Sequence, residues 1–97
     1  MSDHQKDETY WHRVDAVANL ANEQCVSADP NDVGASTLFA AARFNAFVLA
    51  KMMGTGPNLA LERDQALAYF TDQFNKMMAA NLDDFITNFD QYMKPQQ

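Results

Sequence analysis

The stretch VGASTLFAAARFNAFVLAKMM, residues 33–53, decides the fold of this chain. It is the most apolar run in the sequence, and it contains no acidic residue. Large and small apolar side chains recur along it at spacings of three and four, which is the pattern of an α-helix. We therefore expect a central helix over residues 33–53, buried between two others, with Asp32 as its N-cap and Gly54 as its stop.

The residues before this stretch predict a first helix over residues 8–26, after a frayed start at residues 1–6. Either Asp7 or Thr9 is a suitable N-cap. The apolar side chains that recur at helical spacing are Trp11, Val14, Ala18, Ala21 and Cys25. Cys25 lies on this apolar face, so we interpret it as a small buried hydrophobe and not as a nucleophile.

The residues after the central stretch predict a long third helix. Apolar side chains recur about every 3.6 residues, at Leu67, Phe70, Phe74, Met78, Leu82, Phe85, Phe89 and Tyr92. Because this phase does not slip, we expect one helix over residues 60–93, with a kink or break near Asn81 as the alternative. The fold prediction is a single all-α domain over residues 1–97, with three main helices and a tail at residues 94–97.

Composition excludes several classes of function. The 97 residues carry a net charge of −6, which disfavours binding to nucleic acid or anionic lipid. The polar start has no apolar core of a signal peptide, and Arg43, Asn45 and Lys51 interrupt the one long apolar run, so we expect no membrane span. A single cysteine suits a reducing compartment. We therefore expect a cytoplasmic protein.

The sequence offers little catalytic chemistry. His4, Glu8, His12 and Asp15 would share one face if the first helix reached back to His4, and such spacing can hold zinc or nickel. A polar helix face is the more ordinary explanation, so we predict no metal, no cofactor and no catalytic residue. An enzyme remains the less favoured alternative.

Two polar residues of the central stretch define the candidate ligand site. Asn45 falls on the apolar face, where a buried amide needs hydrogen-bond partners, and we expect the first helix to supply them. Arg43 lies on the flank, where its planar guanidinium suits a carboxylate or phosphate. These two residues form the low-priority hypothesis of a pocket between helices.

The end of the third helix predicts self-association. A straight helix over residues 60–93 would carry its last apolar residues beyond the ends of the other two helices. A second copy of the chain would then cover them, since soluble monomers rarely expose so large an apolar patch. We expect a homodimer with residues 82–93 at its centre, formed by Leu82, Phe85, Ile86, Phe89, Tyr92 and Met93.

Three segments carry a family resemblance: LFAAARFNAF at residues 38–47, YFTDQFNKM at 69–77 and NLDD at 81–84. Together they resemble a family of small bacterial proteins known as domain of unknown function 3144, and AARFNAF is the most distinctive piece. The resemblance implies a bacterial, cytosolic, helical protein, and it brings no catalytic residue or cofactor. The sequence therefore favours a non-catalytic interaction or regulatory module, with a small-ligand binder or enzyme as the alternative.

Overall fold

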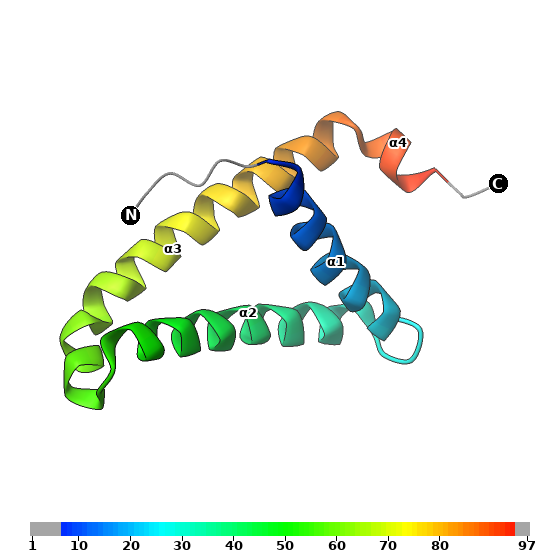
Figure 1. The fold of residues 1–97 in the computed structure, drawn as a ribbon. Helices are drawn as coiled ribbons and strands as arrows, with labels where there is room; N and C mark the ends of the chain where they lie inside the picture. The colour runs from blue at the N-terminus through cyan, green and yellow to red at the C-terminus, as the bar shows by residue number, and fades with distance from the viewer. Residues whose placement is uncertain (1–6, 95–97) are drawn as a thin grey trace. The chain divides into compact units, whose positions relative to one another are not determined.

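Helices make up nearly all of the chain in the computed structural model, which describes residues 7–94 (Figure 1). No strand occurs among these residues, so the all-α prediction is confirmed. The elements in order are α1 (Glu8–Gln24), α2 (Pro30–Met53), α3 (Gly56–Thr87) and α4 (Phe89–Met93). The predicted fraying of residues 1–6 and most of the predicted tail lie outside the described residues.

The backbone divides into two units, Met1–Leu49 and Ala50–Gln97. The first unit holds α1 and most of α2. The second holds the last turn of α2, followed by α3 and α4. The division falls inside the continuous helix α2, and each unit is described by itself below.

Side-chain caps begin two of the helices. The Asp7 carboxylate accepts hydrogen bonds from the Thr9 hydroxyl at 2.7 Å and from the Tyr10 backbone N–H at 3.1 Å. These bonds, that from Thr9 first, lower the pKa of Asp7. Thr55 caps α3 in the same way, accepting from the Asn58 backbone N–H at 3.2 Å. Both residues were among the predicted caps.

The second helix begins three residues before the predicted start. Pro30 is its first residue, and the carboxylate of Asp29 accepts from the backbone N–H of Asn31 at 2.7 Å. Proline suits the first helical position because its missing N–H has no partner there in any case. We had interpreted Pro30 as a helix breaker, and that interpretation was wrong. Gly54 ends α2 with a φ of 82°, the left-handed conformation typical of a glycine stop.

The third helix is continuous through Asn81, so the alternative of a break there is wrong. A single helix to residue 93 is also wrong, because α3 ends at Thr87 and α4 begins at Phe89. Asn88 separates the two with φ −111° and ψ 27°. The apolar phase continues across Asn88, which explains why periodicity did not reveal this break.

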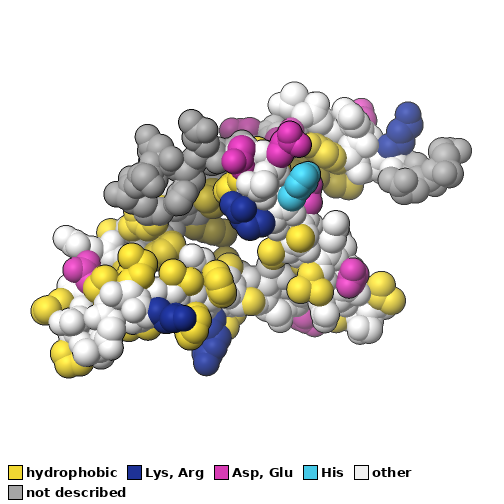
Figure 2. Space-filling view, viewed as in Figure 1, with side chains coloured by type: hydrophobic (Ala, Val, Ile, Leu, Met, Phe, Trp, Pro, Cys, Tyr) yellow, Lys and Arg dark blue, Asp and Glu magenta, His cyan; other side chains and the backbone are white. Residues whose placement is uncertain are grey.

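The expectation that residues 33–53 are buried is wrong. Val33, 8% exposed, is the one buried hydrophobic residue among those that the structure describes. Phe39, Phe44 and Phe47 on α2 are 67, 66 and 58% exposed. Figure 2 shows hydrophobic side chains at the surface along α2, with basic side chains among them. An apolar composition indicates that a helix needs cover, but not which chain supplies it.

Length and composition alone would allow α2 to cross a membrane. Its mean hydropathy reaches 1.4 over the most apolar 18 residues, contrary to the expectation of no such run. The core helix of a soluble protein passes the same test. Arg43, near the midpoint of α2, would cost about 2.5–3.5 kcal/mol at the centre of a bilayer.

Candidate interaction surface

An exposed apolar stripe runs along the second unit. The side chains of this stripe, called here the α3–α4 stripe, are 38–56% exposed: Leu67, Phe70, Phe74, Met78, Leu82, Phe85, Phe89 and Tyr92. At about 100° per residue, the six members on α3 fall within an arc of about 120° around the helix. The stripe is thus a connected surface on one face, and it includes four of the six residues predicted to form a dimer interface.

The predicted interface residues are all exposed. Leu82, Ile86 and Met93 are 55, 73 and 55% exposed. The rings of Phe85 and Tyr92 contact each other, with centroids 4.4 Å apart and planes at 38°. In a straight helix these two residues would be two turns apart, so the bend at Asn88 brings them together.

Asp84 fixes this bend by bonding two side chains. Its Oδ1 accepts from the Asn88 side-chain amide at 2.8 Å, and its Oδ2 accepts from the Tyr92 hydroxyl at 2.7 Å. The hydrogen bond and the negative charge of Asp84 raise the pKa of Tyr92. We call these three side chains the Asp84 latch. Sequence reasoning treated Asp84 as part of a solvated face, although the spacing of four and eight residues was visible.

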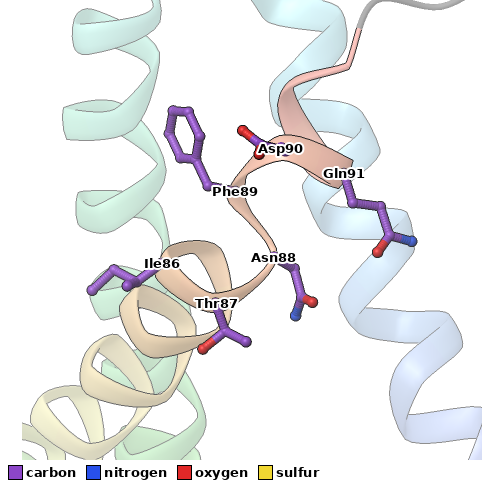
Figure 3. Close-up of a pocket in the computed structure, with 6 residues that line it drawn as sticks. All are labelled: Ile86, Thr87, Asn88, Phe89, Asp90 and Gln91. Atoms are coloured by element: carbon purple, nitrogen blue, oxygen red, sulfur yellow. The ribbon is translucent and has the colours of Figure 1, made fainter.

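A shallow hollow of about 280 Å³ lies at the bend, lined by residues 86–91. Ile86 and Phe89 point to one side of it, while Asn88 and Gln91 point to the other (Figure 3). Its walls come from one short stretch of chain and are open to solvent. The hollow therefore marks the corner between α3 and α4 and does not enclose a ligand.

A larger groove lies in the first unit, between α1 and α2. Its volume is about 600 Å³, which is within the usual range for small-molecule sites. The apolar part of its wall consists of Val17, Leu20, Ala21, Ala28, Val33, Ala40, Ala41 and Phe44. Asn45 lies on the same wall.

The predicted ligand residues Arg43 and Asn45 do not share this groove. Two residues apart on one helix, they point about 200° apart, and Arg43 is not among the residues of the wall. Asn45 is exposed, and its side-chain amide donates to the Ala41 carbonyl of its own helix at 2.8 Å. The expectation that Asn45 is buried and bonded to the first helix is therefore wrong, because its amide finds a partner one turn away.

The remaining candidates from the sequence are less constrained. His4 lies outside the described residues, and residues 7–94 contain no group of three or more potential metal ligands. Cys25 caps the end of α1 and is partly exposed, not fully buried as expected.

Comparison with known proteins gives the family. The model of the family described as "Protein of unknown function (DUF3144)" matches residues 10–86. This chain belongs to DUF3144. The match includes all three segments that carried the resemblance, so that prediction is confirmed.

A solved structure supports the fold of this DUF3144 member. The chain is similar to the NMR structure of the protein NB7890A from Shewanella sp., with 28% sequence identity and a TM-score of 0.70. The similarity covers 96% of this chain and 100% of that one. No curated protein matches the chain.

Proposed function

We propose that this DUF3144 member is a non-catalytic interaction module that works as a homodimer, with residues 82–93 at the centre of the dimer. The observation that carries the proposal is the exposure of the α3–α4 stripe. Its eight apolar side chains, five of them aromatic, are 38–56% exposed along one face. Soluble monomers rarely leave such a surface uncovered, and a two-fold pair is the commonest way to cover it.

Light scattering at micromolar concentration tests this proposal. The wild type is expected at about 22 kDa, twice the 10.9 kDa of one chain. Phe85→Asp places a charge in the proposed interface and is expected to reduce the mass to about 11 kDa. Asn75→Asp adds the same charge to α3 outside the stripe and is the matched control. A wild-type mass near 11 kDa that Phe85→Asp leaves unchanged contradicts the proposal.

The cytoplasm of a bacterium is the compartment that we propose for this module. Arg43 near the midpoint of α2 disfavours a membrane span, and the lone cysteine suits a reducing environment. The similar solved structure comes from Shewanella sp.. Cell fractionation tests the location, and recovery of the native protein in the membrane fraction after a high-salt wash contradicts it.

The groove of the first unit favours a second candidate function, the binding of a small ligand near Asn45. The groove has a suitable volume and a mostly apolar wall with one amide. Screening a fragment library by NMR tests this function. Binding is expected to shift the amide signals of Val17, Thr37 and Ala41, and Asn45→Ala is expected to weaken it. Hits that bind only elsewhere would contradict this role, and Arg43→Ala tests whether the guanidinium takes part.

A further inference from the structure

Asn81 is a polar residue in the middle of the α3–α4 stripe. It lies about 20° from Phe74 around the helix, so it falls within the arc of the stripe. Four members of the stripe precede it and four follow it. Asn81 is exposed, and its side-chain amide donates to the Met77 carbonyl at 2.8 Å.

The hydrogen-bonding capacity of Asn81 is only partly used. A side-chain amide has two N–H donors and an oxygen that accepts. The described residues supply one partner, the Met77 carbonyl, and none for Oδ1. Any partner that covers the stripe must satisfy this oxygen, because a buried amide left without hydrogen bonds is strongly disfavoured.

The area of the stripe fits a second copy of the chain. Eight large side chains, each about half exposed, offer about 700 Å² per copy, since a buried aromatic residue contributes roughly 150–250 Å². A pair of stripes would bury about 1,400 Å² in total, which is within the range of stable protein interfaces. A second copy also supplies an identical amide for Asn81.

Antiparallel pairing places that amide correctly. The stripe extends equally far on both sides of Asn81, so a two-fold axis beside this residue lays the first half of each stripe over the second half of the other. Parallel pairing would instead set Asp83, Asp84 and Asp90 level with their own copies, where like charges repel. The balanced stripe and the acidic C-terminal half favour the antiparallel arrangement.

We propose that the two α3 helices of the homodimer pair antiparallel about a two-fold axis beside Asn81, whose two copies hydrogen-bond to each other and set the register. This inference rests on the proposed homodimer. A single polar residue in an apolar helical interface is a known means of fixing register, because a shifted pairing leaves its amide unsatisfied. The axis lies next to Leu82, at the edge of the segment proposed as the dimer centre.

Cysteine cross-linking of the full chain tests the register. In a Cys25→Ser background, Asn81→Cys is expected to form a covalent dimer on mild oxidation about tenfold faster than Leu67→Cys, since a disulfide needs Cα atoms within about 7 Å. About an axis at Asn81 the two copies of residue 67 lie about 42 Å apart along the helix, whereas parallel helices would bring them together.

The cross-linking outcomes separate the two proposals. Equal cross-linking at both positions means parallel pairing and overturns the inference, as does a 22 kDa wild type that cross-links at neither. A wild-type mass near 11 kDa overturns the homodimer itself.

A second variant tests the role of the amide. Asn81→Leu is expected to leave association intact but to raise cross-linking at residue 67 at least severalfold in the double variant with Leu67→Cys, because other registers become accessible. Asn75→Leu makes the same change outside the stripe and is expected to leave cross-linking as it was. Unchanged cross-linking in the Asn81 variant means that its amide does not set the register.

Discussion

At the scale of the residue, asparagines of this chain satisfy their amides locally. Asn45, Asn81 and Asn88 each donate a side-chain N–H to a residue four positions earlier. The first two bond a backbone carbonyl of their own helix. Asn88 bonds the side chain of Asp84, and this is the asparagine at which the helix ends. The partner, more than the residue type, decides whether the helix continues.

Replacing Asn45 by alanine is expected to change the free energy of unfolding by less than about 0.5 kcal/mol, because exposed substitutions on a helix have small effects. Alanine is also the better helix former. Urea denaturation of the two proteins measures the difference. A loss of 1 kcal/mol or more would mean that Asn45 has a buried partner, as first expected from the sequence.

The Tyr92 hydroxyl gives the Asp84 latch a pH dependence. Because the hydrogen bond to Asp84 raises the pKa of Tyr92 above its ordinary value of 10.0, the latch contributes fully below pH 10 and loses its contribution as the pH rises through the raised value. Titration of tyrosinate absorbance is expected to show one tyrosine with a high midpoint. Asp84→Asn should lower that midpoint, and Tyr92→Phe should remove it. A titration that Asp84→Asn leaves unchanged contradicts the latch.

At the scale of the element, the break between α3 and α4 depends on Asn88. Asparagine disfavours helix interiors because its side chain competes with backbone hydrogen bonding. We expect Asn88→Ala to join the two helices into one that ends near Met93, since the apolar phase already continues across this point. Backbone NMR chemical shifts of residues 86–93 measure the change. Shifts that still mark a break at residue 88 would mean that Tyr92 and Asp84 hold the bend without Asn88.

The helices were largely predictable from the sequence, and their ends less so. Caps at Asp7 and Thr55 were visible because each precedes an apolar periodic run. The start at Pro30 was missed because proline both breaks a helix and suits its first position. The break at Asn88 was missed because it depends on side-chain bonds to Asp84, and periodicity carries no trace of them.

At the scale of the whole molecule, burial was the least predictable property. Periodicity shows which face of a helix needs cover, and it identified the α3–α4 stripe correctly. It does not show what supplies the cover, and for this reason residues 33–53 were wrongly placed in a core. The candidate ligand pair failed to converge for a simpler reason, since residues 43 and 45 point to different sides of α2.

Salt is expected to strengthen the proposed dimer. Each chain carries a net charge of −6, so two copies repel each other, and added salt screens that repulsion. Sedimentation equilibrium at low and at physiological ionic strength measures the dissociation constant, which should fall as salt is added. A constant that rises with salt would mean that ion pairs, and not apolar contacts, hold the copies together.

The central claim is that a second copy covers the α3–α4 stripe, and isotope-filtered NMR tests it most directly. A mixture of labelled and unlabelled chains reports only contacts between copies. We predict such contacts from the Met78 and Leu82 methyl groups to the ring of Phe85 in the other copy. Contacts from the stripe that run only within one chain, to residues of α1 or α2, would contradict the account.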